Sequence, residues 1–481
     1  MLLYAVVCVP LLVALAALAL PSQRLRPWLL PAAGLCHGGI VLALLRAPVE
    51  TGAHGWLVLD RLGRPVLAFL SVLFLLCALY APGYLAQRAE RKNRVFCACV
   101  LTSLGAISLV VLAHHLGLMW VALETTTLAA APLVYFNHNA RSIEATWKYL
   151  LIGSVGIALA LLGSFFLAYG SLKAGLASTL LFEDLVAHAP EISRPWLHAS
   201  FVLLFVGFGT KMGLAPMHTW KPDAYGEAPG LVGTLLAGGL TTGAFVAILR
   251  FFQICNAAGE AAFARQFMIA LGLLSMAVAG VFLVRQRDFK RMLAYSSVEH
   301  MGILVLGVGI GGEAVFGSLL HLVNNGLCKA VLFLSAGNIH RAFGSKRTEH
   351  VSGALCRVPG SAALLLAGFF AITGSPPFGP FMSEFTIVRG AFATGHFAIA
   401  AAFLFFLTVI FIGMGATVLG VVQGKPPADA PEPRFRERFS TLAPIGLALA
   451  LVLLLGVHLP EPVGALLRDA ASFVDPQAAA R

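Results

Sequence analysis

Residues 204–250 read LFVGFGTKMGLAPMHTWKPDAYGEAPGLVGTLLAGGLTTGAFVAILR. An apolar stretch at the start carries one lysine, Lys211, and a second apolar stretch follows an interruption that contains His218 and three prolines, Pro216, Pro222 and Pro229. A lysine in membrane hydrocarbon costs roughly 2.5–3.5 kcal/mol on insertion scales, so it is rarely kept without a function. Interrupted backbone at membrane depth persists only inside protein or beside a water-filled cavity. The segment therefore predicts a proton or ion site within a multi-helix membrane protein.

The composition agrees with a membrane protein. Of 481 residues, 59% are hydrophobic and only 11% are charged, which excludes a water-soluble domain. The formal net charge of +11 comes from cations in short loops between apolar spans. No basic run with interleaved aromatics occurs, so we expect the lipid bilayer as a partner and no nucleic acid. The first apolar run, 2–20, lacks a basic leader and a clean cleavage site, and we interpret it as a retained span.

The sequence predicts no metal site and no cofactor. Eight cysteines are scattered, and Cys97 and Cys99, the one close pair, lack a second pair or a histidine set that would complete a zinc or iron–sulfur site. No axial histidine set for haem and no GxxxxGK[ST] loop for ATP are present. We therefore expect a chain that moves protons but does not supply the energy for their movement.

Apolar runs of about 20 residues predict an all-α integral membrane fold. Segment 172–190 is too polar to span and predicts a short amphipathic helix on the surface, and 425–438 forms a Pro-rich polar loop. The expected spans are about fourteen, at 2–20, 28–46, 64–86, 95–113, 116–136, 146–170, 196–216, 229–254, 262–284, 290–311, 313–339, 360–392, 394–423 and 440–459.

The distribution of cations predicts the orientation. Of 33 Lys and Arg residues, 20 fall in loops after odd-numbered helices, Lys221 among them, and 8 fall in loops after even-numbered helices. This bias places the odd loops in the cytoplasm and both termini outside, in a bacterial inner membrane. Two more cations lie in the C-terminal tail, and three lie inside apolar helices, where topology does not explain them: Lys148, Lys211 and Lys329.

The buried charges recur in two halves of the chain. Helices five to seven and helices ten to twelve each carry three, at offsets of 173 to 181 residues: Glu124, Lys148 and Lys211, then Glu299, Lys329 and Glu384. Prolines interrupt helices seven and twelve alike, and WKYLLIGSVG (147–156) resembles CKAVLFLSAG (328–337). A displacement by five helices predicts inverted repeats. We therefore divide the chain into N-terminal helices (1–94), a first repeat (95–254), a second repeat (262–423) and a C-terminal part (424–481).

These side chains suit a proton path. Glu124 beside Lys211 would form a switchable pair, since together both stay charged and apart the lysine releases its proton; the alternative is a fixed ion pair that only holds helices together. Lys148 and Lys329 are candidates for central relays, although Lys148 could instead snorkel to the helix end. His321 lies on the same helical face as Lys329 and is a further candidate. The remaining candidates are His218 and His300.

Four stretches carry a family resemblance: GTKMGLAPMHTWKPDA (209–224), RDFKRMLAYSSVEHMGI (287–303), HLVNNGLCKAVLFLSAG (321–337) and SPPFGPFMSEF (375–385). They resemble the antiporter-like proton-pumping subunits of respiratory complex I, membrane-bound hydrogenases and Mrp antiporters. Within this family, their sequence is most similar to the hydrogenase-4 component F type. The resemblance implies fourteen helices, two inverted five-helix repeats and a hydrophilic axis across the membrane centre. It also implies relay roles for Glu124, Lys148, Lys211, Lys329 and Glu384.

The sequence also departs from this family. Asn325 stands where some relatives carry a second histidine, and Thr241 or Thr242 stands where M-type subunits carry a lysine. The chain stops shortly after helix fourteen, so we expect no long lateral helix.

Three functions fit the sequence. The first is a proton-translocating subunit of a redox-driven complex, not catalytic alone, with other membrane subunits and, indirectly, peripheral redox subunits as partners. The second is a subunit of an Mrp-like sodium/proton antiporter. The third is a membrane anchor of an inorganic-carbon uptake complex.

Overall fold

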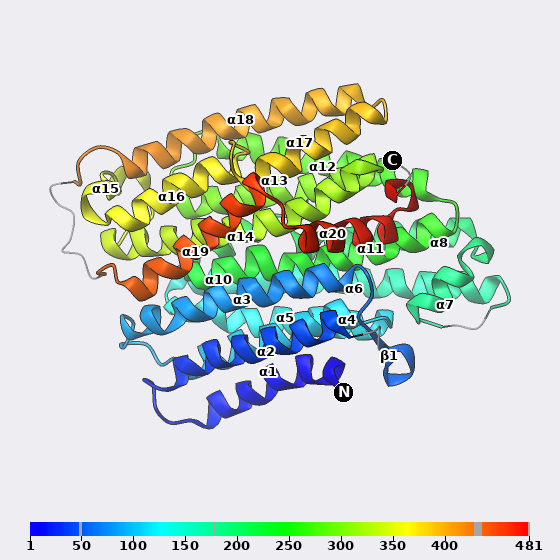
Figure 1. Ribbon diagram of the computed structural model, residues 1–481, viewed down its shortest axis with the longest axis horizontal. Helices are drawn as coiled ribbons and strands as arrows, with labels where there is room; N and C mark the ends of the chain where they lie inside the picture. The colour runs from blue at the N-terminus through cyan, green and yellow to red at the C-terminus, as the bar shows by residue number, and fades with distance from the viewer. Residues whose placement is uncertain (48–50, 177–178, 428–434, 480–481) are drawn as a thin grey trace.

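The structure is a computed structural model that describes residues 1–47, 51–176, 179–427 and 435–479. Its helices lie side by side in one bundle, and most run from one end of the bundle to the other (Figure 1). The uninterrupted long helices are α1 (Leu2–Ala19), α2 (Leu29–Arg46), α3 (Gly63–Ala86), α4 (Arg94–Leu112), α5 (Leu116–Val134), α6 (Ala140–Lys173), α8 (Arg194–Met212), α12 (Ala261–Leu283), α13 (Phe289–Ile310), α14 (Glu313–Phe343), α18 (Phe397–Val422) and α19 (Phe439–Val457).

The described residues contain twelve helices, or helix groups, that are long and apolar enough to cross a membrane, so the chain is a multi-pass membrane protein. They correspond to twelve of the fourteen predicted spans. The predicted seventh span is α8, and the predicted twelfth is divided into α16 (Pro359–Ile372) and α17 (Gly379–Ala393). The all-α membrane fold is therefore confirmed, while the count of fourteen and the inverted repeats stay predictions.

Both predicted interruptions are present, and both begin at a left-handed glycine. After α8, Gly213 adopts a φ of 79°, and the chain continues to the short helix α9 (Lys221–Glu227). After α16, Gly374 adopts a φ of 68° and the chain continues to α17. Only glycine enters this region without a steric penalty, which is why it ends so many helices. Prolines that follow cannot donate a backbone hydrogen bond, so neither helix resumes at once.

The helices at the centre of the bundle are buried all round. The predicted eighth span consists of α10 (Gly230–Thr234), a π-helical turn η5 (Leu235–Leu240) and α11 (Thr241–Ala257), and its membrane-crossing window is 100% buried, as is that of α13. The window of α14 is 94% buried, whereas only 33% of that of α1 and 28% of that of α18 are buried. A helix that is apolar all round belongs inside a large assembly of helices. Polar side chains on α13 and α14 are therefore shielded from lipid.

Several small elements complete the fold. Segment 172–190 holds the end of α6 and the short helix α7 (Phe182–Ala187), which buries Phe182 and Leu185 and exposes its acidic residues, as an amphipathic surface helix should. The sequence did not predict the short antiparallel pair β1 (Thr51–Gly52) and β2 (Leu57–Val58), nor α20 (Glu461–Val474). The remaining short elements are η1 (Arg26–Trp28), η2 (Ala53–Gly55), η3 (Tyr135–Asn137), η4 (Ala189–Glu191), η6 (Thr348–His350), α15 (Ala354–Arg357) and η7 (Pro476–Ala479).

The loops that follow odd-numbered spans meet at one end of the bundle, which we call the cation-rich end. There Arg91 donates to the carbonyl of Asn137 at 2.7 Å, and the Lys346 ammonium lies 2.5 Å from the Glu227 carboxylate. Both chain termini lie at the opposite end (Figure 1). Arg434 and Arg481, two of the counted cations, and half of the Pro-rich loop fall outside the described residues.

Candidate functional site

The first part of the site joins α5 to the end of α8. The Thr127 hydroxyl donates to the Glu124 carboxylate at 3.0 Å and accepts a hydrogen bond from the Lys211 ammonium. Lys211 is 4% exposed, and its Nζ lies 5.5 Å from the centre of the Tyr149 ring. The structure thus brings Glu124 and Lys211 together as predicted, with a hydroxyl between them that can accept and donate a proton. The predicted burial of Glu124 is wrong, however, because its side chain is only partly buried.

The second part of the site lies between α13 and α14. The Lys329 ammonium, which is fully buried, donates to the Ser296 hydroxyl at 2.9 Å. Glu299, one turn further along α13, is 2% exposed, and its Oε2 lies 3.8 Å from Nε2 of His300. Removing one member of such a buried set leaves an uncompensated charge, which is strongly destabilising. We therefore expect the loss of any one polar group around Lys329 and Glu299 to destabilise the fold.

Two histidines continue this row of polar side chains, which we call the line, toward α17. Nδ1 of His300 and Nε2 of His321 lie 2.9 Å apart, and Nδ1 of His321 lies 2.9 Å from the Ser383 hydroxyl. Both rings are at least 99% buried. Because each imidazole has one donor and one acceptor nitrogen when neutral, a pair in this contact can pass a proton from ring to ring.

Glu384 closes the line at the start of α17. Its side chain is 5% exposed, and its Oε1 has no hydrogen-bond partner among the described residues. A Cβ built on Gly374 would lie 2.1 Å from Oε2 of Glu384, so the carboxylate packs directly on the left-handed turn that interrupts the helix. The interruption of the twelfth span therefore makes room for this carboxylate.

His300, His321 and Glu384 are residue types that can also bind a metal ion. Ligand-type atoms of His300, His321 and Glu384 lie within 4.8 Å of one another. The facing nitrogens of the two rings, however, hydrogen-bond to each other, and the second nitrogen of His321 is engaged by Ser383. Nε2 of His300 has no hydrogen-bond partner among the described residues, but a metal at His321 would have to displace one of the two contacts of that ring, because a ligating nitrogen must be free of protons. We interpret the group as one that shares protons.

Lys148 lies away from this line, at the cation-rich end. Its ammonium pairs with Asp223 at 2.8 Å and with Glu144 at 2.6 Å, and 42% of its side chain is exposed. This position matches the snorkelling alternative and places the lysine away from a central relay. Arg291 pairs with the other oxygen of Asp223 at 2.8 Å, so one carboxylate ties α6 to α13 through α9.

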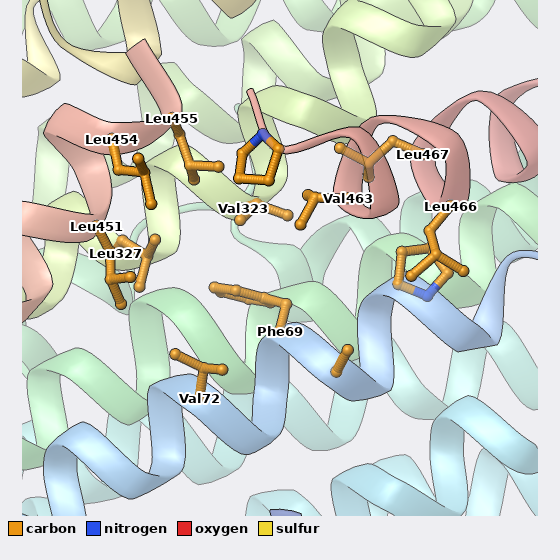
Figure 2. Close-up of a pocket in the computed structure, with 13 residues that line it drawn as sticks. Phe69, Val72, Val323, Leu327, Leu451, Leu454, Leu455, Val463, Leu466 and Leu467 are labelled. Atoms are coloured by element: carbon orange, nitrogen blue, oxygen red, sulfur yellow. The ribbon is translucent and has the colours of Figure 1, made fainter. Parts of the chain in front are cut away.

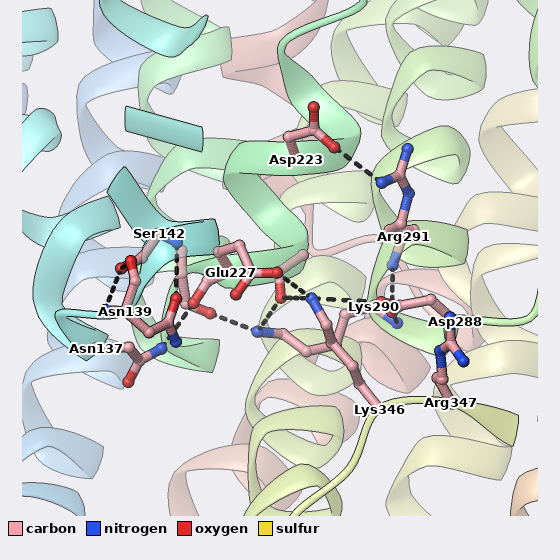
Figure 3. A network of polar contacts seen from close by, with 12 residues as sticks. Asn137, Asn139, Ser142, Asp223, Glu227, Asp288, Lys290, Arg291, Lys346 and Arg347 are labelled. Atoms are coloured by element: carbon pink, nitrogen blue, oxygen red, sulfur yellow. Dashed lines mark hydrogen bonds and ion pairs between the residues drawn. The ribbon is translucent and has the colours of Figure 1, made fainter. Parts of the chain in front are cut away.

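Figure 3 shows the network to which Asp223 belongs. The buried ammonium of Lys290 donates to the carbonyls of Gly226, at 3.0 Å, and Ala228, and Lys346 pairs with Glu227 and with Asp288. Cations at the carbonyl end of a helix satisfy both its unpaired acceptors and its dipole. The network therefore anchors the end of α9 to the start of α13.

Other candidates are satisfied locally or lie apart. Thr241 and Thr242 donate to backbone carbonyls four residues earlier, at 2.7 Å each, as helical threonines often do. His218 lies in the interruption after α8, 7% exposed, beside the rings of Phe282 and Tyr295. Asn325 is buried in α14, and its Oδ1 has no partner in the part of the chain that the structure describes.

Sequence reasoning missed two hydroxyls in the line, those of Thr127 and Ser383. Each signal was available, because Thr127 stands three residues after Glu124 on the same helical face and Ser383 directly precedes Glu384. The assembled line crosses α5, α8, α13, α14 and α17, and its members are Glu124, Thr127, Lys211, Ser296, Lys329, Glu299, His300, His321, Ser383 and Glu384.

A separate pocket of about 210 Å³ opens between α3, α14, α19 and α20. Its walls are apolar and are formed by Phe69 of α3, by Val323 and Leu327 of α14 and by leucines of α19 and α20 (Figure 2). A pocket without polar groups offers no ligand to an ion and no partner to a chain of waters. It therefore does not extend the polar line.

Residues 113–411 match the family model described as NADH:quinone oxidoreductase/Mrp antiporter, transmembrane. The chain belongs to this family. A hydrogenase-4 component F homolog from Methylacidiphilum infernorum is 34% identical over 399 residues, which cover 80% of this chain and 82% of the relative. An NADH-quinone oxidoreductase subunit N from Desulforudis audaxviator is 30% identical over 474 residues, which cover 94% and 93%. Both relatives agree with the predicted resemblance.

The fold is similar to that of solved members of such assemblies. A chain in the structure of the Mrp complex from Dietzia sp. DQ12-45-1b aligns with a TM-score of 0.88 at 20% identity and covers 100% of this chain and 99% of its own length. At this identity the likeness concerns the fold alone. The overall fold is thus shared between the two chains.

Proposed function

We propose that the chain is a proton-translocating membrane subunit of a redox-driven complex of the hydrogenase or complex I kind. The proposal is carried by one observation: from the partly buried Glu124, buried lysines, histidines, hydroxyls and acids follow each other through the centre of the bundle to Glu384. A structural role would need a few fixed ion pairs. It would not need neutral groups such as Thr127 and the His300–His321 pair, which can both accept and donate a proton.

The same line supports specific roles. Glu124 and Lys211 exchange a proton through Thr127 at one end, and Lys329 holds the middle. The two histidines deliver the proton to Glu384 at the other end. The cation-rich end faces the cytoplasm in this proposal, and both termini face outside, since positive residues are retained on the cytoplasmic side. Neighbouring membrane subunits and a peripheral redox module supply the energy.

The test is purification of the tagged chain from its native membranes together with its partners. The purified complex is reconstituted into vesicles, and a potassium diffusion potential with valinomycin drives protons, which pyranine inside the vesicles reports. We expect hydrogenase- or dehydrogenase-type subunits to co-purify and the complex to conduct protons. The chain alone should build no gradient from ATP, NADH or formate.

Other results of this experiment would support one of the two alternative functions. Proton flux that requires sodium on the opposite side would identify an Mrp-like antiporter. Co-purification with a large zinc protein and no proton flux would identify an anchor and overturn the proposal.

A further inference from the structure

A further buried lysine, which the sequence places in a loop, lies beside the line. Lys221, the first residue of α9, is 0% exposed. Its ammonium lies 3.4 Å from the carbonyl of Ser297 and 5.7 Å from the centre of the Tyr225 ring. Among the described residues, no carboxylate forms an ion pair with it. The hydrogen bond to the Ser297 carbonyl is long, so little in the described part of the chain compensates a charge on this side chain.

On one side, Lys221 packs against the end of α8. A Cβ on Gly213 would lie 2.4 Å from Cε of Lys221 and 2.9 Å from its Nζ. The glycine at this position therefore serves both the left-handed turn and the close approach of the ammonium. Lys211 belongs to the same last turn of α8, and the carbonyl end of a helix favours a cation beside it.

On the other side, Lys221 faces α13 at the position where Lys329 is held. Its contact is the carbonyl of Ser297, and the preceding residue, Ser296, accepts the hydrogen bond of Lys329 at 2.9 Å. Lys221 thus packs against the turn that follows Lys211 on one side and against the turn of α13 that holds Lys329 on the other. It lies where the line otherwise has a gap, since the Ser297 hydroxyl is turned back to the carbonyl of Leu293.

Resting on the proposed function, we propose that Lys221 is the relay that joins the Glu124–Lys211 part of the site to the Lys329–Glu384 part. In its amine form Lys221 takes a proton from the Lys211 ammonium, so that an N–H bond breaks at Lys211 and one forms at Lys221. The Lys221 ammonium then gives a proton to the amine of Lys329, directly or through water, and returns to the amine. No other bond changes, and the steps run equally well in reverse.

The test is proton flux through the reconstituted complex with Lys221→Met, which keeps the length of the side chain and removes the titratable group. Because Lys221 has no carboxylate to leave unpaired, this variant should assemble at wild-type abundance. A general acid–base group contributes about 10²–10⁴ in rate, so we expect flux to fall at least roughly 100-fold. Lys221→Arg should fail similarly, because arginine is not deprotonated in proteins.

The matched control is Lys290→Arg. Lys290 is similarly buried, but its ammonium donates to two backbone carbonyls, which an arginine can also do. The proton flux of the Lys290→Arg complex should therefore stay near that of the wild type. Lys221→His should restore part of the flux with an optimum shifted to lower pH, a result that a structural lysine would not give.

Wild-type flux in assembled Lys221→Met or Lys221→Arg would overturn the inference and leave the proposed function standing. Absence of flux in the wild-type complex would instead overturn the proposed function.

Discussion

Replacing Thr127 with valine should interrupt proton movement at one hydroxyl. The substitution keeps the shape of the side chain and removes the group that donates to Glu124 at 3.0 Å and accepts from Lys211. Hydrogen bonds to charged groups contribute about 1.5–3 kcal/mol each. If the transfer loses one such bond, the barrier rises by that amount, and the rate falls about 10- to 150-fold.

The neighbouring residue provides a matched control. Thr126 is as buried as Thr127, but its hydroxyl donates only to the backbone carbonyl of Leu123, at 2.6 Å. Thr126→Val therefore removes a buried hydroxyl of the same kind without touching Glu124 or Lys211. Any general effect of the substitution on packing of α5 should appear in both variants.

The assay is proton flux through the purified complex in vesicles, driven by a potassium diffusion potential and normalised to the abundance of the complex in the membrane. The proton flux of Thr127→Val should fall at least about tenfold, as the loss of one hydrogen bond requires. The flux of Thr126→Val should stay within twofold of wild type. Equal flux in the two variants would refute the view that Thr127 carries the proton between Glu124 and Lys211.

Three further predictions concern other parts of the chain. A cysteine placed in 285–291 should react with impermeant reagents only from the cytoplasmic side, and labelling from outside would invert the topology. Gly374→Ala should displace the Glu384 carboxylate and reduce flux, whereas Gly395→Ala, also at positive φ but with nothing within 4 Å of its Cβ, should not; equal loss in both would assign the effect to backbone strain. Burial lowers the pKa of His114, in the connection between α4 and α5, from 6.5 to about 3. Between these two pH values the unfolded chain therefore binds more protons than the folded chain. The free energy of unfolding should therefore fall as pH drops below 6.5, by at most about 1.4 kcal/mol per unit, and thermal melts of His114→Gln should lose this slope; an unchanged slope would contradict it.

Much of the fold was readable from the sequence because the membrane leaves few choices. Backbone groups must be satisfied within each span, so long apolar runs become helices and their ends are marked by cations and prolines. The two interruptions were predicted from Pro216 and Pro376, and both occur. The helix α20 was missed because its charged residues and short length exclude a span, although its buried residues recur at helical spacing.

The site was only partly readable, because burial depends on which helices surround a residue. Lys148 and Lys221 show this in opposite directions. Lys148 lies in an apolar run, yet it is only about two turns from the start of α6 at the cation-rich end, and it reaches Asp223. Lys221 lies among prolines, as loop residues do, yet the helix that it begins, α9, packs against α6 and α13, and its side chain is fully buried. Neither outcome follows from local sequence, since both depend on packing between segments far apart in the chain.

The central claim is that a chain of titratable groups, and not a set of fixed ion pairs, runs through the bundle. Proton flux through the assembled Lys211→Arg complex tests it most directly. Arginine keeps the positive charge beside Thr127 and Glu124 but cannot release its proton. We predict that the variant assembles at normal abundance and that its flux is abolished. Wild-type flux in assembled Lys211→Arg would mean that the lysine only holds helices together, and it would contradict the relay.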